Sequence, residues 1–322
     1  MKTKALIILL SDGLIHSGAS LALHLGVSRT AVWKQVRRAV GKGYRIETIR
    51  GKGYRLIDAV DLLDPDRVRA ILPEQISGRI RLKVMDSVDS TNAEVIRFRA
   101  TGSEELIVCL ADQQTAGRGR RGKPWQSPAG ENIYLSLGLK LRGGFASLDG
   151  LSLVVGVAIA EALESLGVER VGLKWPNDLQ FDGQKLAGIL IELQGELEGA
   201  AQVVVGIGLN VHMRNAQGVE QAWTSLDLAA GKSGQVWERN HIAAALIEHV
   251  LGAVDSFSEH GFGLFRDRWQ QRDVFVGKML QSIQGDHRGI GLGINDAGHY
   301  LLETLSGNES IHAGEISLRV ES

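Results

Sequence analysis

The sequence has very little cysteine and no long hydrophobic run. Cys109 is its single cysteine, which excludes an internal disulfide and any zinc site built from several cysteines. This cysteine stands in the apolar run 106–110, so we expect a core residue rather than a nucleophile. No apolar run reaches membrane-spanning length, and the N-terminus has no clear secretory signal. Together these features predict a cytoplasmic protein in a reducing compartment, without a membrane partner.

Net charge is small, but positive charge gathers at the start of the chain. The formal net charge is −1, yet residues 1–57 contain eleven lysines and arginines and two acids, which gives this segment +9 and the remainder −10. A basic head on an acidic body is typical of a separate domain that faces nucleic acid. The length of 322 residues is enough for two or three domains.

The basic head predicts a helix-turn-helix. Residues 17–26 form a short helix, and Gly26 supplies the turn. Ser28 is a good N-cap for a second helix over residues 29–40. The apolar residues of this second helix share one face: Val32, Val36, Ala39 and Val40. The opposite face is polar and basic, as expected for a helix that enters the major groove; the plain alternative is an ordinary solvated basic face.

A repeated pentapeptide follows the second helix. Gly-Lys-Gly-Tyr-Arg occurs at residues 41–45 and again at 51–55. We expect two short strands, around residues 45–49 and 54–57, which form a wing behind the helix. Basic residues of the wing, Arg55 among them, are suited to phosphate contacts, which give affinity without sequence information.

The head therefore predicts a winged helix-turn-helix that binds operator DNA. Its expected DNA contacts are Ser28, Arg29, Thr30, Lys34, Arg37, Arg38, Arg50 and Lys52. The acidic residues 58–66, which Pro65 interrupts, indicate a linker or a boundary.

A loop in the acidic body is rich in both glycine and arginine. Residues 117–122 read Gly-Arg-Gly-Arg-Arg-Gly. Glycine lets the backbone approach a ligand and adopt positive φ, and arginine supplies a planar charge that grips phosphate or carboxylate. The loop predicts an anion site that becomes ordered when the anion arrives; the plain alternative is an arginine-rich surface turn.

Three nucleotide-binding patterns nearly match, and all three fail. The loop glycines fit G-x-G-x-x-G, but Pro124 and Pro128 follow where a helix has to begin. In the phosphate-binding loop of nucleotide hydrolases, Pro124 would stand at the position of the metal-binding hydroxyl. Residues 231–233, Gly-Lys-Ser, lack the required first glycine because Leu226 occupies its place.

The body itself predicts an α+β fold with an irregular order of elements. Strands are expected at residues 79–85, 106–112, 132–141, 171–175, 185–192 and 203–210, and helices at 92–99, 151–166 and 240–257. Short strands at 274–283, 289–294, 300–304 and 316–320 predict a small C-terminal β barrel. We therefore expect three domains: residues 1–60, 66–270 and 271–322.

Five segments of the body, taken in order, carry a family resemblance. They are Asp-Ser-Thr-Asn at 89–92, Gln-Thr-Ala-Gly-Arg-Gly-Arg-Arg-Gly at 114–122, Lys-Trp-Pro-Asn-Asp at 174–178, Lys-Leu-Ala-Gly-Ile-Leu at 185–190 and Gly-Ile-Gly-Leu-Asn at 206–210. This set closely resembles the biotin–protein ligases, and the winged head resembles the bifunctional biotin operon repressor type. The resemblance extends to Gly-Glu-Ile-Ser-Leu-Arg at 314–319.

The resemblance implies a fold and a reaction. The central domain would be similar to class II aminoacyl-tRNA synthetases, and the C-terminal domain to a small SH3-like barrel. Biotin and ATP, with Mg²⁺ on the phosphates, would give biotinyl-5′-adenylate, and a lysine of a biotin carboxyl carrier protein would then accept the biotin. The adenylate would also act as corepressor, promoting a homodimer that binds a two-fold operator.

The resemblance also implies residue roles. Biotin would be held by Ser90, Thr91, Asn92, Gln114, Arg118, Gly119, Arg120 and Lys185. The nucleotide would be held by Arg121, Trp125, Lys174, Asn177 and Asn210. Catalysis would depend on Arg118, Arg120, Arg121, Lys185 and Asp178, with no residue assigned to a metal.

Each of these roles has a plainer structural alternative. Asp178 would orient or deprotonate the incoming amine, or simply form a salt bridge to a cation of the site. Asn210 could end a strand, and Lys185 could be a solvated strand end. For the whole protein, the alternatives are a ligand-sensing repressor without ligase activity and a lipoate-type protein ligase.

Overall fold

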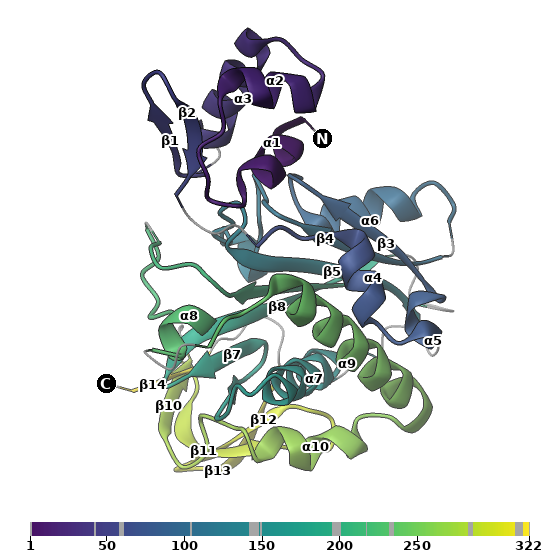
Figure 1. Ribbon diagram of the computed structural model, residues 1–322. Helices are drawn as coiled ribbons and strands as arrows, with labels where there is room; N and C mark the ends of the chain where they lie inside the picture. The colour runs from purple at the N-terminus through teal and green to yellow at the C-terminus, as the bar shows by residue number, and fades with distance from the viewer. Residues whose placement is uncertain are drawn as a thin grey trace.

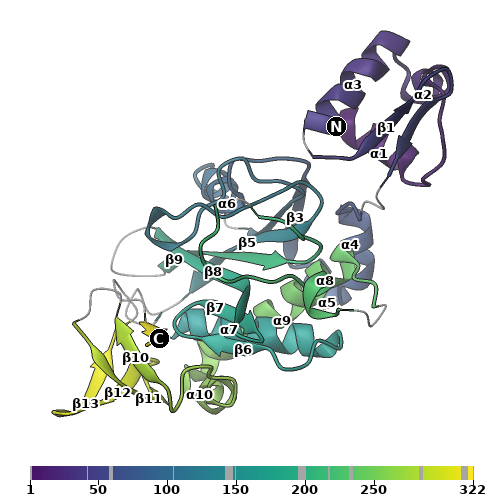
Figure 2. The same cartoon turned by 90° about the vertical axis from the view of Figure 1, so that its left-hand side faces the viewer.

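The protein is built from a small head, a central mixed sheet and a C-terminal sheet, which follow one another along the chain (Figure 1). The computed structural model describes residues 2–41, 43–57, 61–103, 105–141, 148, 150–194, 201–216, 218–231, 235–282, 286–312 and 318–321. The head stands apart from the other two parts, as the side view in Figure 2 shows. None of the described helices is long and apolar enough to cross a membrane.

The head contains the predicted helix-turn-helix and one additional helix. Its helices are α1 (Lys2–Leu10), α2 (Gly18–Leu25) and α3 (Arg29–Gly41). The predicted signals work as expected, because Gly26 turns at φ +61° and the Ser28 hydroxyl accepts a hydrogen bond from the Ala31 amide at 3.2 Å. One apolar assignment was wrong: Val40 is 49% exposed, and Gln35 is buried on the packed face of α3 instead.

The wing is firmly attached to the rest of the head. Strands β1 (Ile46–Ile49) and β2 (Gly53–Leu56) pair antiparallel. His16 and Tyr54 exchange two backbone hydrogen bonds, each 2.9 Å. A side chain at Gly53 would place its Cβ 2.0 Å from the His16 carbonyl oxygen, so only glycine allows this approach. Arg55 pairs with Glu47 across the strands, at 2.7 Å, and its expected phosphate contact remains a prediction.

The segment that joins the head to the body is held by buried polar groups. Arg239 is 0% exposed, and its guanidinium donates to the Asp61 carbonyl at 2.7 Å and to the Asp112 carboxylate at 2.9 Å. Asn240 accepts from the Asp64 amide at 2.8 Å. The expected linker at 58–66 thus ends in an anchored segment, and Pro65 begins helix α4 (Pro65–Ile71); residues 58–60 lie outside the described residues.

A seven-stranded mixed sheet forms the centre of the body. Its order is β3-β4-β5-β9-β8-β7-β6; β3 and β4 are parallel and the remaining pairs are antiparallel. The strands are β3 (Ile80–Met85), β4 (Leu106–Ala111), β5 (Asn132–Leu141), β6 (Gly172–Lys174), β7 (Asp178–Phe181), β8 (Gln184–Gln194) and β9 (Ala201–Asn210). The sequence predicted all of them except β7, whose four residues contain too little alternation to indicate a strand.

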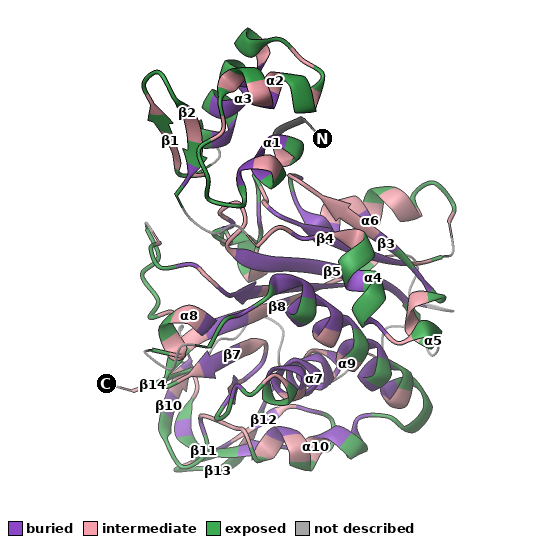
Figure 3. Cartoon of the chain, in the orientation of Figure 1, coloured by how far each residue is buried: buried purple, intermediate pink, exposed green. Residues whose placement is uncertain are grey.

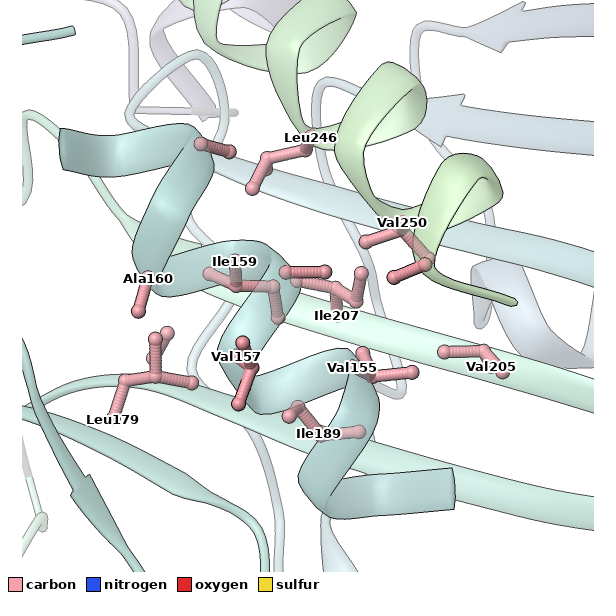
Figure 4. Close-up of a cluster of buried hydrophobic side chains, with 14 of the residues drawn as sticks. Val155, Val157, Ile159, Ala160, Leu179, Ile189, Val205, Ile207, Leu246 and Val250 are labelled. Atoms are coloured by element: carbon pink, nitrogen blue, oxygen red, sulfur yellow. The ribbon is translucent and has the colours of Figure 1, made fainter. Parts of the chain in front are cut away.

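Helices cover both faces of this sheet. On one face α7 (Leu151–Ser165) and α9 (Arg239–His260) pack together on the strands, and Figure 4 shows Val155 and Ile159 of α7 among Ile189, Ile207 and Val250. This is the most deeply buried layer of the molecule (Figure 3). Helix α6 (Thr91–Arg99) packs on β4, β5 and β9.

Cys109 lies between α6 and the sheet, as the sequence predicted. It is fully buried together with Val95, Ile107 and Val204, and burial raises the pKa of its thiol to about 12. A thiol of this kind is inert at neutral pH. The core interpretation of Cys109 is therefore confirmed.

The remaining elements are short. Helices α5 (Glu74–Ser77), α8 (Leu226–Ala229) and α10 (Gly263–Gln270) connect larger parts, and the sequence reasoning missed all three. The Gly-Lys-Ser sequence at 231–233, rejected as a phosphate loop, lies mostly outside the described residues.

The C-terminal part is a five-stranded antiparallel sheet in the order β13-β12-β11-β10-β14. Its strands are β10 (Met279–Ser282), β11 (Arg288–Ile294), β12 (Tyr300–Thr304), β13 (Gly307–Ile311) and β14 (Leu318–Val320). The sequence missed β13 and began the first strand too early, since residues 274–278 form the approach to it. Residues 283 and 316–317, also predicted as strand, lie outside the described residues.

The central and C-terminal sheets share one hydrophobic core. Trp175, Trp269 and Phe275 surround the ring of Tyr300, and the Trp175 indole donates to the Gly298 carbonyl at 3.1 Å. Because the core continues across it, the boundary placed at residue 271 remains a prediction.

A carboxyl group at this junction predicts a pH effect on stability. Asp273 accepts hydrogen bonds from the Phe275 amide and the Tyr300 hydroxyl, yet burial raises its pKa to about 6. The folded protein therefore keeps a proton that the unfolded chain releases near its ordinary pKa of 3.8, and the contribution of Asp273 to stability falls as pH rises from about 4 to about 6.

We expect Asp273→Asn to remove this fall. As pH rises from about 4 to about 6, the unfolding free energy of the variant should increase by about 2 kcal/mol relative to that of the wild type. Urea unfolding at a series of pH values measures it. Asp286→Asn, at an exposed position, is the control, and parallel curves for wild type and Asp273→Asn would contradict the prediction.

Candidate active site

The predicted site residues of the body line one cavity of about 760 Å³. Antiparallel pairing brings their strand ends to one edge of the sheet, since Lys174 pairs with Asp178, Asp178 with Gly188, and Gly188 with Gly208. The predicted residues that line the cavity are Ser90, Thr91, Asn92, Gln114, Arg118, Gly119, Arg120, Arg121, Trp125, Lys174, Asn177, Asp178, Lys185 and Asn210. Five segments that are distant in sequence thus form one concave surface.

Glycines of the central strands form the floor of the cavity. A Cβ at Gly206 would lie 2.3 Å from Asn92 Oδ1, and a Cβ at Gly208 would lie 2.5 Å from the Trp125 ring. Gly188 lies opposite Gly208 in the register and also contacts Trp125. The absent side chains leave room for polar groups on one side and an aromatic ring on the other.

A polar network occupies the part of the cavity near α6. The Gln114 side-chain oxygen accepts hydrogen bonds from the Thr91 amide at 2.9 Å and the Thr91 hydroxyl at 3.1 Å. The hydroxyl of buried Ser136 lies 2.7 Å from the Thr91 hydroxyl and 2.6 Å from Asn92 Oδ1. Ser90 occupies the N-cap position of α6, but its side chain makes no capping bond. Ser90 lines the cavity instead.

The glycine–arginine loop is a closed turn beside this network. The Gly119 amide donates to the Lys123 carbonyl at 2.7 Å, and the Trp125 amide donates to the Gly117 carbonyl at 2.9 Å. Positive φ occurs at Arg121 and Gly122. Gly117 is required for a different reason, because its Cβ would lie 2.6 Å from the Ser127 hydroxyl.

Two arginines of the loop contact the strands that form the cavity. Arg118 pairs with Glu192 of β8 at 3.3 Å. Glu192 also accepts a hydrogen bond from the side-chain amide of Asn92 at 2.6 Å. Arg120 donates to Asn177 Oδ1 at 3.1 Å, and burial lowers the pKa of its guanidinium. The loop is therefore attached to the cavity, which argues against a surface turn.

Lys185 and Asp178 form an ion pair in the cavity. The lysine nitrogen lies 2.7 Å from an Asp178 oxygen and 5.4 Å from the centre of the Trp125 ring. The salt bridge considered as an alternative for Asp178 is thus present, and the alternative of a solvated end for Lys185 does not hold. Burial lowers the pKa of the Lys174 ammonium, an effect that Asp178 opposes.

Two predicted residues of the cavity differ in how their side-chain nitrogens are satisfied. The side-chain amide of Asn210 donates to the Thr224 carbonyl at 2.9 Å. Asn210 therefore ends strand β9 and also lines the cavity. The Trp125 indole nitrogen is buried and has no hydrogen-bond partner among the described residues.

Sequence reasoning missed several residues of the site. Ser136 and Glu192 gave no signal, because their partners lie 44 and 100 positions away in the chain. Lys123 and Arg319 add cations to the cavity wall; Arg319 was quoted for the resemblance without a role, and its neighbours 314–317 lie outside the described residues. The cavity lining contains seven lysines and arginines and two carboxylates.

The predicted DNA contacts form an exposed surface on the head. All of Ser28, Arg29, Thr30, Lys34, Arg37, Arg38, Arg50 and Lys52 are exposed. They come from the N-terminal and outer parts of α3 and from the turn of the wing. Trp33, which the sequence reasoning did not consider, is exposed on the same helix.

Comparisons with known proteins agree with this division of the chain. An HTH domain family matches residues 2–55, and the Biotin/lipoate A/B protein ligase family matches residues 84–210. The bifunctional ligase/repressor BirA of Escherichia coli is 40% identical over 98% of this chain and 96% of its own. The chain belongs to the bifunctional ligase/repressor BirA family.

More distant members of this family and a solved structure support the same conclusion. The BirA of Bacillus subtilis is 32% identical over 94% of this chain and 93% of its own. The structure of a biotin protein ligase from Aquifex aeolicus in complex with biotin and ATP has a TM-score of 0.65 and 29% identity, and covers 75% of this chain and 99% of that one. The predicted family, the α+β fold with a DNA-binding head, and the enzyme class of biotin–protein ligase are confirmed.

Proposed function

We propose that the cavity activates biotin with ATP and that the product, biotinyl-5′-adenylate, passes its biotin to a lysine of a biotin carboxyl carrier protein. The observation that carries the proposal is the continuity of two different surfaces in one cavity. Neutral hydrogen-bonding groups gather around Gln114, and cations gather around Arg120 and Lys185. An uncharged bicyclic urea with a carboxylate tail, joined to a nucleotide phosphate, needs both surfaces.

The first step builds up negative charge where the cations lie. A carboxylate oxygen of biotin attacks the α-phosphorus of ATP, an oxygen–phosphorus bond forms, and pyrophosphate leaves. We assign to Arg118, Arg120 and Arg121, which line the cavity, the stabilisation of charge on the phosphate oxygens, and to Lys185 that on the carboxylate. Positioned charges in a partly closed cavity supply most of such rate acceleration.

The second step transfers biotin to the acceptor. The lysine amine attacks the carbonyl carbon of the mixed anhydride, and AMP leaves with the phosphate oxygen that had joined it to biotin. Asp178 holds Lys185 beside the reacting centre. We propose that Asp178 also orients the incoming amine, whose proton passes to water as the amide bond forms.

Residues on the nucleotide side are assigned in the same way. Trp125 would pack near the adenine, with Lys174, Asn177 and Asn210 around the ribose and phosphates. The described residues contain no group of three histidine, cysteine or acidic side chains that could hold a metal. Mg²⁺ needs few protein ligands when phosphates supply the others, so we propose that it enters with ATP.

Pyrophosphate release tests the ligase activity. With ATP present, we expect pyrophosphate only when biotin is added, and biotinylated carrier protein only when the carrier is present as well. Lipoate in place of biotin is the matched control for the lipoate-type alternative. Biotin binding without pyrophosphate would instead support the alternative of a repressor without ligase activity.

Substitutions of two glycines in the cavity floor distinguish the proposed biotin subsite from the proposed nucleotide subsite. Gly206→Ala forces Asn92 aside and should raise the KM for biotin about tenfold, with little change in the KM for ATP. Gly208→Ala displaces Trp125 and should do the reverse. Steady-state kinetics of both variants measure the difference.

Gly252→Ala is the control for this pair. It adds the same methyl group in α9, where no atom lies within 4 Å of the new Cβ, and should leave both constants unchanged. Equal rises of both constants in both floor variants would show that the division into subsites is wrong.

We further propose that the adenylate acts as corepressor in the cytoplasm. The arginine loop would become ordered on the ligand, the ordered protein would form a homodimer, and two heads would bind a two-fold operator. The relatives named as bifunctional ligase/repressor and the exposed basic surface of α3 support this proposal.

Dimer affinity tests the coupling. Biotin with ATP should lower the dimer dissociation constant by about tenfold or more, a coupling of ordinary size. Analytical ultracentrifugation measures it, and Gly206→Ala at the same biotin concentration should remain closer to the unliganded value. The same dissociation constant with and without biotin and ATP would refute the coupling.

A further inference from the structure

A large aromatic side chain projects from the recognition helix. Trp33 is 47% exposed and belongs to α3, whose buried face consists of Val32, Gln35, Val36 and Ala39. It is not part of the hydrophobic cluster of the head. The fold of the head therefore does not explain why an indole stands at this position.

Trp33 is placed among the residues expected to face DNA. Thr30 lies three residues before Trp33 and Arg37 four residues after it, so these three project from the same side of the helix. The Arg37 guanidinium carbon lies 5.1 Å from the centre of the Trp33 ring. This cation–π contact restricts the arginine before any partner arrives.

The charge around Trp33 indicates which kind of partner it meets. Helix α3 contains four cations, Arg29, Lys34, Arg37 and Arg38, and no acid. Contact with the same helix of a second copy would oppose like charges. A nucleic acid duplex supplies the opposite charge, and an exposed apolar surface within such a patch suits the apolar edges of bases.

We propose that Trp33 is a specificity-determining residue that packs on the 5-methyl group of a thymine in the major groove, with Arg37 held beside it to bind the neighbouring base. The inference rests on the proposed repressor function of the head. In the major groove only thymine presents a methyl group, and apolar side chains recognise it by contact. Trp33 would thus read sequence, whereas the surrounding lysines and arginines contribute mainly affinity.

The test uses the full-length protein with biotin and ATP. A pool of duplexes with a randomised central segment is selected for binding, and each thymine of the selected duplex is then replaced by deoxyuridine, which removes only the methyl group. At one position in each half-site, we expect the replacement to weaken wild-type binding about fourfold, the effect of one buried methyl group. Trp33→Ala should bind the thymine duplex more weakly and show no loss with deoxyuridine.

Two comparisons make the result specific. Leu23→Ala truncates another exposed apolar side chain of the head, in α2, and should retain the wild-type response to deoxyuridine. Lys34→Ala should reduce the slope of affinity against salt concentration by about one, while Trp33→Ala should leave that slope unchanged because it removes no charge.

The outcomes distinguish failure of the role proposed for Trp33 from failure of the proposed repressor function. If the wild type selects no sequence, the repressor function fails. If it selects one but no thymine position responds to deoxyuridine, or Trp33→Ala responds as the wild type does, the role of Trp33 is refuted alone. Loss of dimer formation by Trp33→Ala in the absence of DNA would assign the side chain to a protein contact instead.

Discussion

One buried positive charge, that of Arg239, joins the linker to two strands of the central sheet. The Arg239 guanidinium donates to Asp61 in the linker, to Asp112 at the end of β4, and to the Asn132 carbonyl at the start of β5, at 2.9 Å. A charge so far from water is stable only when its partners stay in place. The Arg239 side chain of α9 thus joins the linker to strands β4 and β5 of the central sheet.

The partners of Arg239 lead directly to the active site. Asp112 precedes the chain segment that contains Gln114 and the arginine loop. Asn132 accepts a hydrogen bond from the Val211 amide at 3.0 Å, immediately after Asn210 in the cavity wall. The linker that follows the head and two segments beside the cavity therefore share one set of hydrogen bonds.

Much of the fold and the site was predictable because local patterns specify them. Ser28 marks a helix start through its hydroxyl and Gly26 a helix end through its positive φ. The charge of the loop at 117–122 is evident from its arginines. Glu192, Ser136 and Arg239 were not predictable, since each acts on residues far away in the chain. Val40 was assigned wrongly to the packed face because a helical pattern does not show where packing stops. The cross-strand partner of Arg55, Glu47, was not predicted because the pattern does not reveal the strand register.

The close contact between Gly53 and His16 has a consequence for how the head meets a duplex. With the wing bonded to the turn before α2, the separation between the hairpin tip and the groove-reading helix is set in advance. The distance between the wing and the helix is therefore preorganised, and little conformational entropy is lost when the head binds a duplex. Duplexes whose groove width does not match this distance would bind more weakly even when every base is correct.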